Sequence, residues 1–455
     1  MRLRLPFPAV AAALLVAAGP AAAQAHVRAA QAPGRVIVRF AAESTHSERL
    51  RVQREVGART TETDLPGGAR ALSTRPGASV AATVTALRRH PTVAYAVPDY
   101  VAHTSQAPPP PPAFVPNDPG RGGAGNWQAV QWNFTGPFSV NAPQAWAEAA
   151  AAGAAGGRGV EIALIDSGIA YENRGRFRRS PDFSAHQFLT GHDFVDHDSH
   201  PDDEESHGTH GAGTLAERTN NGVALTGLAY GAKILPLRVL DSEGNGEGSS
   251  IARAIRYAAK KRAKIINMSV EFESGMRAGD IPEVLSAIRY AYKKGSVMVA
   301  ASGNEGDSRV TYPAAAAQVI SVGATTVDGC QADYSNGGAR LDVVAPGGGS
   351  DAPNSDNPVD QQNCHPENRG RAIFQESFTR NPKTFGIVGF EGTSFSTPHV
   401  SAIAALIVAT KVVGPHPTPA QIKQRIEQTA TDLGPPGYDQ RYGFGLVNAA
   451  AAIAR

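Results

Sequence analysis

The sequence has little cysteine, almost no net charge, and no long apolar run beyond its first residues. Its two cysteines belong to no CxxC pair and there is no HExxH pattern, which argues against a zinc site. No Lys/Arg block is interleaved with aromatic residues, so nothing indicates nucleic-acid binding. After residue 25 no run reaches the roughly 18 apolar residues of a membrane-spanning helix, and we expect no membrane association of the mature protein.

The two cysteines, Cys330 and Cys364, leave two possibilities open. As a pair they would close a loop of about 35 residues and add about 3–4 kcal/mol of stability on the chain-entropy model. The alternative is two free buried thiols. An exported protein favours the disulfide.

The first 25 residues are typical of a secretory signal peptide. Arg2 and Arg4 precede a short apolar run, and 23–25 is an A-x-A cleavage signal. The apolar run is too short for a membrane anchor, which is the alternative. We therefore expect a secreted protein, extracellular or periplasmic.

Charge and proline divide the rest of the chain. Residues 26–104 carry 11 arginines against 6 acidic residues, whereas 117–455 carry 30 basic against 35 acidic residues. A basic front segment and an acidic main body attract each other. Five consecutive prolines lie in 105–116, which we interpret as an extended, exposed linker.

Apolar patterns predict two kinds of fold on either side of that linker. The front segment has alternating strand patterns at 35–40 and 93–97, the second ended by Pro98, and helical patterns at 47–56 and 80–89. From residue 117, wholly apolar strands alternate with helices, which indicates a parallel sheet covered on both faces. We interpret 348–386 as an irregular, polar surface insertion.

Four residues are candidates for chemistry, although each has an ordinary explanation when taken alone. Asp166 and Asn304 follow apolar strands and are typical of turns, while His207 begins a helical segment of small residues and would serve as a cap or ligand. Ser394 lies before an apolar helix, 400–410, with Pro398 in its expected first turn. At a helix start, free N–H groups favour developing negative charge near this serine.

Together the four are more specific, because their order is Asp, His, Ser. The strings IDSG, HGTHGAGT, ASGNEG and GTSFSTPHV resemble the subtilisin-like serine proteases, notably thermitase-like members, from residue 117 onward. VPDYV at 97–101 is similar to the end of that family's inhibitory propeptide. The resemblance implies an α/β protein with a three-layer subtilisin-like fold and a mainly parallel sheet, preceded by a small α+β propeptide domain.

The implied activity is that of a secreted serine endopeptidase made as an autoprocessed precursor. Asp166 would orient His207, which would activate Ser394 for acyl transfer, and Asn304 would stabilise the oxyanion. The implied organisation is a signal peptide (1–25), an inhibitory propeptide that also assists folding (26–104), the Pro-rich linker (105–116) and the peptidase domain (117–455). We expect a monomer acting on proteins or peptides. The alternative is a catalytically silent subtilisin-fold peptide-binding protein.

The resemblance also implies a cleft that pairs with an extended peptide. Glu271 departs from the family, which usually has glycine there, and with Glu305 it is a candidate for selecting Lys or Arg; the alternative is a solvated rim carboxylate. The implied substrate-binding residues are Leu240, Gly244, Ser269, Val270, Glu271, Ala301, Ser302 and Gly303.

Calcium is the implied cofactor, in a structural role. Asp118, Asp182 and Asn221 match oxygen-ligand positions of thermitase-like relatives, and oxygen donors suit Ca²⁺. The alternative is a metal-free loop. A separate acidic run at 197–205 is interpreted as a solvated face.

Overall fold

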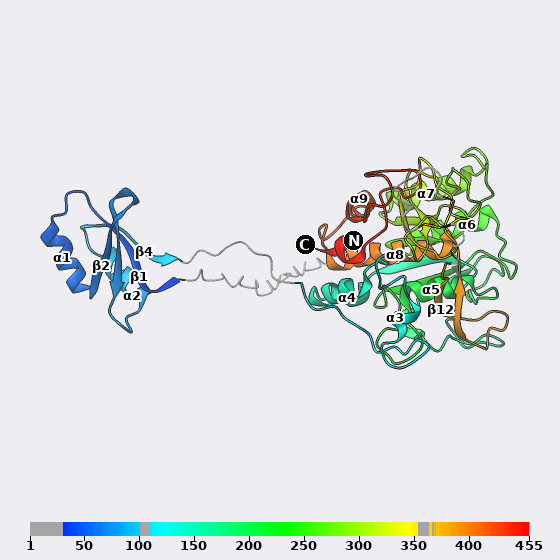
Figure 1. Ribbon diagram of the computed structural model, residues 1–455, viewed down its shortest axis with the longest axis horizontal. Helices are drawn as coiled ribbons and strands as arrows, with labels where there is room; N and C mark the ends of the chain where they lie inside the picture. Colours follow the sequence, from blue (N-terminus) through cyan, green and yellow to red (C-terminus); the bar gives the residue numbers. More distant parts are fainter. Residues whose placement is uncertain (1–30, 101–109, 354–363, 366–367, 369, 455) are drawn as a thin grey trace, which may run out of the picture. The chain divides into compact units, whose positions relative to one another are not determined.

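The computed structural model describes residues 31–100, 110–353, 364–365, 368 and 370–454 (Figure 1). They fall into two compact units, one ending at Pro108 and the other starting at Pro109. The predicted signal peptide and residues 105–109 of the predicted Pro-rich linker lie outside the described residues. The last residues of the predicted linker are described, and the backbone N–H of Phe114 donates to the carbonyl of Pro143 at 3.0 Å.

The first unit is a four-stranded antiparallel sheet, ordered β2-β3-β1-β4, with two helices. Its core is formed by apolar side chains of the sheet and of both helices, among them Val36, Val52 and Leu87. The elements are β1 (Gln31–Phe40), α1 (His46–Glu55), β2 (Ala58–Leu65), η1 (Pro66–Gly68), β3 (Ala69–Thr74), α2 (Val80–Arg88) and β4 (Val93–Tyr100).

Pro98 does not end the last strand of this unit, so that prediction was wrong. β4 continues to Tyr100, and Pro98 lies opposite Val36 of β1. β4 is an edge strand, where proline is tolerated because its missing N–H leaves no neighbouring strand unpaired.

The second unit is built on a seven-stranded sheet in which every neighbouring pair is parallel. The strands are largely buried, as the wholly apolar patterns predicted. In the sheet order they are β11 (Val343–Pro346), β10 (Val319–Thr325), β9 (Val297–Ala301), β8 (Ile265–Met268), β5 (Glu161–Asp166), β7 (Lys233–Arg238) and β6 (His192–Asp193).

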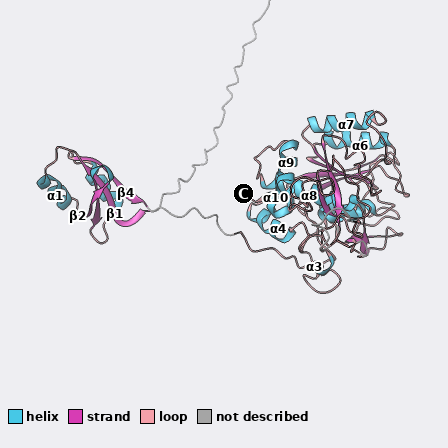
Figure 2. Ribbon diagram, turned by 45° about the horizontal axis from the view of Figure 1, so that its top comes forward, coloured by secondary structure: helices cyan, strands magenta, loops and turns pink. Residues whose placement is uncertain are grey.

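Helices cover both faces of this sheet, which confirms the three-layer fold. Ile162 and Leu164 of β5 pack with α4, α5, α8, α9 and α10, whereas Ala163 and Ile165 pack with α6 and α7. Figure 2 shows α6 and α7 together on one side of the strands. The helices are α3 (Trp127–Val130), α4 (Ala142–Ala151), η2 (Ala155–Gly157), η3 (Ala185–Gln187), α5 (His207–Ala216), α6 (Gly248–Lys260), α7 (Pro282–Lys293), α8 (Thr393–Thr410), α9 (Pro419–Thr429) and α10 (Ala449–Ile453).

Within the described ranges, α8 is the one helix long and apolar enough to cross a membrane by length and composition. Its 18 residues are 83% buried inside the unit, where it contacts β8, β9, β10 and β11. α8 is therefore the central helix of the core, and burial explains its apolar composition.

The segment 348–386 is more ordered than predicted. It contains β12 (Ile373–Ser377), which pairs with β13 (Gly386–Phe390), and β12 packs against α5. Cys330 and Cys364 form a disulfide that joins the same segment to the turn after β10, so the alternative of free thiols is excluded. The prediction of an irregular surface insertion was wrong for β12, because its side chains are buried by contacts distant in sequence.

Candidate active site

The carboxyl edge of the parallel sheet brings Asp166, His207 and Ser394 to one end of the second unit. Asp166 is the last residue of β5, His207 begins α5, and Ser394 lies in the first turn of α8. His207 Nδ1 is 2.7 Å from Asp166 Oδ1, which also accepts the Ser167 N–H at 2.7 Å. The Asp166 side chain is 1% exposed and that of His207 is 23% exposed. An imidazole fixed by a buried carboxylate can accept a proton at its other nitrogen.

A second buried carboxylate, Asp203, holds the turn that leads into α5. It accepts the N–H groups of Ser206 and Thr209 at 2.9 Å each and the hydroxyl of Ser167 at 2.9 Å. Ser206 adopts φ 97°, a conformation that such hydrogen bonds must maintain. Asp203 thereby fixes the position of His207 relative to β5.

The charges around His207 favour its protonated form. Burial by itself lowers its pKa, but Asp166, through charge and hydrogen bond, and then Glu205 and Asp203 raise the pKa to about 9. Glu205 Oε2 also accepts the His207 backbone N–H at 2.6 Å. Phe395 packs on the imidazole, with ring centroids 4.8 Å apart.

Ser394 is held at the start of α8 by an exchange of hydrogen bonds that depends on Pro398. The expected helix began at residue 400 with Pro398 in its first turn; α8 instead starts at Thr393 and contains Pro398 in its interior. Proline cannot donate to the carbonyl four residues earlier, which is that of Ser394. This carbonyl accepts the Ser269 hydroxyl at 2.8 Å instead, and the Ser394 hydroxyl donates to the Ser269 carbonyl at 3.2 Å.

Asn304 lies beside Ser394, after the end of β9. Its Oδ1 accepts the backbone N–H of Thr393 at 2.8 Å, which orients the amide. Its Nδ2 donates to Glu271 Oε1 at 3.1 Å. The amide that we expected to serve an oxyanion is therefore engaged by a carboxylate in this structure.

A cavity of about 410 Å³ runs along this edge and is lined by both His207 and Ser394. Five of the eight predicted substrate-binding residues line it, together with six further residues, of which Asn245 and Gly246 directly follow the predicted Gly244. The predicted ones are Leu240, Gly244, Ser269, Val270 and Glu271, and the additional ones are Glu205, Asn245, Gly246, Ile251, Phe272 and Glu273.

The structure does not bring Ala301, Ser302 and Gly303 to the wall of this cavity. All three are buried, and the Ser302 hydroxyl donates to the carbonyl of Asn336 at 2.8 Å. Their predicted place at the cavity wall is not what the structure shows.

The interpretation of the acidic run at 197–205 as a solvated face was wrong for Asp202, Asp203 and Glu205, whereas His197 and Asp198 are exposed. Asp202 and Asp203 are 2% and 0% exposed, and Glu205 lines the cavity. The signal that was available is position, since Glu205 stands two residues before His207. The sequence could not show which cations would pair with the run.

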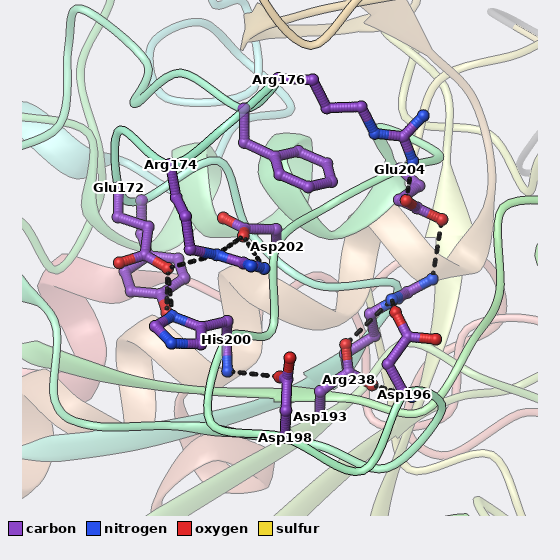
Figure 3. A network of polar contacts seen from close by, with 12 residues as sticks. Glu172, Arg174, Arg176, Asp193, Asp196, Asp198, His200, Asp202, Glu204 and Arg238 are labelled. Atoms are coloured by element: carbon purple, nitrogen blue, oxygen red, sulfur yellow. Dashed lines mark hydrogen bonds and ion pairs between the residues drawn. The ribbon is translucent and has the colours of Figure 1, made fainter.

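Those cations are arginines from distant segments, as Figure 3 shows. Arg238, 3% exposed, contacts Asp193 at 2.9 Å, Asp196 at 2.8 Å and Glu204 at 3.1 Å. Arg238 Nε also donates to the carbonyl of Leu240 at the cavity wall. Nearby ion pairs continue the network from Arg174 to Asp202 and Glu172, from Arg176 to Glu204, and from His200 to Glu172.

The three predicted calcium ligands are brought together around the loop that follows the C-terminal end of α5, and none of them lines the cavity. Asn221 Nδ2 donates to Asp182 Oδ1 at 2.7 Å, and the Asn221 N–H donates to Asp118 Oδ1 at 2.9 Å. Burial, and then the carboxylate of Glu376, raise the pKa of Asp182 to about 8. The buried oxygens fit Ca²⁺, which prefers carboxylate and amide donors. The described residues contain no cluster of three His, Cys, Asp or Glu side chains suited to a metal, so carbonyl groups would have to complete the shell.

Both units match families of known proteins. Residues 157–445 match the subtilase family, Peptidase S8, and residues 17–99 match the fervidolysin N-terminal prodomain. The thermophilic serine proteinase of Bacillus sp. (strain AK1) is 33% identical over 431 residues, 94% of this chain and 89% of that protein. Thermitase of Thermoactinomyces vulgaris is 32% identical over 340 residues, 75% of this chain and 99% of that protein. A protease structure from Pseudoalteromonas arctica PAMC 21717 has a TM-score of 0.59 and 30% identity, covering 74% of this chain and 98% of that one.

Proposed function

Because this chain belongs to the subtilase family and is a subtilisin-like serine endopeptidase with a prodomain, we propose that it cleaves peptide bonds through an acyl-enzyme on Ser394. Asp166 and His207 complete the catalytic triad. The observation that carries the proposal is the 2.7 Å contact of His207 with buried Asp166, in a cavity wall shared with Ser394.

In the first step His207 Nε2 takes the hydroxyl proton of Ser394 as its oxygen attacks the substrate carbonyl carbon. The Ser394 side chain must turn from the Ser269 carbonyl toward His207, as is common when a free site closes on substrate. The carbonyl π bond opens to an oxyanion. His207 then gives the proton to the leaving amine as the C–N bond breaks, and Asp166 stabilises the imidazolium in between.

The acyl-enzyme is hydrolysed by water in the reverse sequence of proton transfers, with His207 again as base. The Ser394 N–H at the start of α8 and Asn304 Nδ2 are the donors suited to the oxyanion. Asn304 must first leave or share its hydrogen bond with Glu271.

We further propose that the chain is exported, that residues 26–104 fold and inhibit the peptidase unit before removal, and that the mature enzyme is a monomer. The net basic charge of that segment and the net acidic charge of 117–455 support docking. Asp118, Asp182 and Asn221 would hold a structural Ca²⁺, which would offset buried negative charge.

The test is the intact mass of the expressed full chain, wild type beside Ser394→Ala, with Ser308→Ala as an exposed serine control. We expect wild type and Ser308→Ala to lose residues up to the Pro-rich linker, and Ser394→Ala to keep them and hydrolyse no peptide. If all three proteins keep these residues and hydrolyse no peptide, the chain is a catalytically silent peptide-binding protein. Peptide hydrolysis by Ser394→Ala would exclude Ser394 as the nucleophile.

A further inference from the structure

Glu271 occupies an unusual position, between the oxyanion donor and the cavity. It follows the end of β8, lines the cavity, and accepts the Asn304 amide through Oε1 at 3.1 Å. Its other oxygen, Oε2, is buried and has no hydrogen-bond partner among the described residues. A buried carboxylate oxygen without a partner is costly, so this atom is suited to a donor that is supplied by a ligand.

The charges that face Glu271 are also negative. Glu205 and Glu273 line the same cavity, and Glu305 lies close enough to raise the pKa of Glu271, after burial, which is the larger cause. Glu305 Oε2 is itself occupied by the Asn336 amide at 2.5 Å. Among the cavity-lining residues of the described chain, His207 is the one side chain able to carry positive charge, and it is paired with Asp166.

We propose that Glu271 is a specificity residue that selects peptides with arginine or lysine on the acyl side of the cleaved bond. This selectivity presupposes the proposed function. Asn304 has to meet the carbonyl of the cleaved bond, and the side chain nearest that carbonyl is that of the residue on its acyl side. Glu271, in contact with Asn304, therefore faces that side chain.

The same contact couples recognition to catalysis. While the cavity holds no cation, Glu271 competes with the substrate for the Asn304 amide. A guanidinium or ammonium group gives Glu271 charge-assisted hydrogen bonds that replace the one from Asn304. Asn304 Nδ2 is then free for the oxyanion, so a basic side chain increases transition-state stabilisation as well as binding.

The experiment compares kcat/KM for two peptides that differ only in arginine or its neutral isostere citrulline at that position. The enzymes are wild type, Glu271→Gln, and Glu283→Gln, an exposed glutamate outside the cavity lining. We expect wild type and Glu283→Gln to prefer arginine by about tenfold or more, as for a charge-assisted pair, with kcat as well as KM affected. Glu271→Gln should reduce the preference to about twofold or less. Equal values for both peptides in wild type, or an unchanged preference in Glu271→Gln, would overturn the proposal.

Labelling with a fluorophosphonate separates the proposed catalytic function from the proposed specificity. The reagent reacts with an activated serine and has no substrate side chain for Glu271 to recognise. A wild type that is labelled at Ser394 but shows no preference for arginine refutes the specificity and leaves the proposed function intact. A wild type that is not labelled refutes both. Should Glu271→Gln fail to fold, which loss of labelling reveals, the wild-type ratio of arginine to citrulline still decides.

Discussion

Ser269 and Ser394 bond to each other in both directions: the Ser269 hydroxyl donates to the Ser394 carbonyl at 2.8 Å, and the Ser394 hydroxyl donates to the Ser269 carbonyl at 3.2 Å. The first bond is available because Pro398 leaves that carbonyl without a helical donor. The segment after β8 and the start of α8 are thereby joined at Ser394.

Replacing Ser269 with alanine should therefore reduce catalysis beyond its effect on folding. Loss of one buried hydrogen bond costs about 1 kcal/mol of stability, and misplacement of Ser394 should lower kcat about tenfold. Ser296→Ala is the matched control, since that buried hydroxyl donates to the Ala263 carbonyl at 2.8 Å away from the site. Urea unfolding and peptide hydrolysis measure the two effects. Equal kcat in both variants would contradict a positioning role for Ser269.

The raised pKa of His207 predicts an alkaline activity profile. His207 must be neutral to act as a base, so kcat/KM should rise with pH until it passes about 9. The protonated pair with Asp166 stabilises the folded protein fully below the ordinary histidine pKa of 6.5, and this contribution is lost as pH rises through about 9.

Glu205→Gln tests the cause of that shift. The amide oxygen can still accept the His207 N–H, but the negative charge is gone, so the pKa of His207 should fall. The acidic limb of kcat/KM moves to lower pH, and activity at pH 7 increases about two- to threefold. Glu283→Gln should leave the limb in place. A limb that stays fixed in Glu205→Gln would show that Glu205 does not set this pKa.

Arg238 and Arg176 both contact Glu204 but differ in burial. Arg238→Met leaves Asp193 buried without its cation, and breaking such a pair costs about 3–5 kcal/mol. Arg176 has 63% of its side chain exposed, so Arg176→Met should lower the free energy of unfolding by less than about 1 kcal/mol. Denaturant unfolding in a Ser394→Ala background, which prevents self-digestion, gives both values. Similar losses of stability in the two variants would mean that burial does not determine how much these ion pairs contribute.

Calcium should stabilise the peptidase unit through Asp118. A ligand at 100 times its Kd adds about 2.7 kcal/mol to the folded state, so chelation of the Ser394→Ala protein should lower its Tm by several degrees. Asp118→Asn should abolish most of that difference, because one of the two carboxylates is lost. Calorimetry with and without added calcium measures it. If the Tm of the Ser394→Ala protein with Asp118 intact does not respond to calcium, the loop binds no calcium.

The sequence alone determined the local chemistry and the architecture of the second unit. Wholly apolar strands alternating with helices required a parallel sheet buried on both faces, and Asp166, His207 and Ser394 followed recognisable patterns. Parallel strands end at a common edge, so residues that follow different strands meet there whatever their separation in sequence.

The tertiary structure decided which charges are buried and which face the substrate. The acidic run looked solvated because Arg174 and Arg238, which neutralise it, come from other segments. Ala301 to Gly303 are buried and do not line the cavity, whereas Glu205 does. The hydrogen bond between Glu271 and Asn304 could not be predicted either, since it depends on two side chains from the segments after β8 and β9 approaching to 3.1 Å. Burial and pairing depend on distances in space, which sequence patterns do not specify.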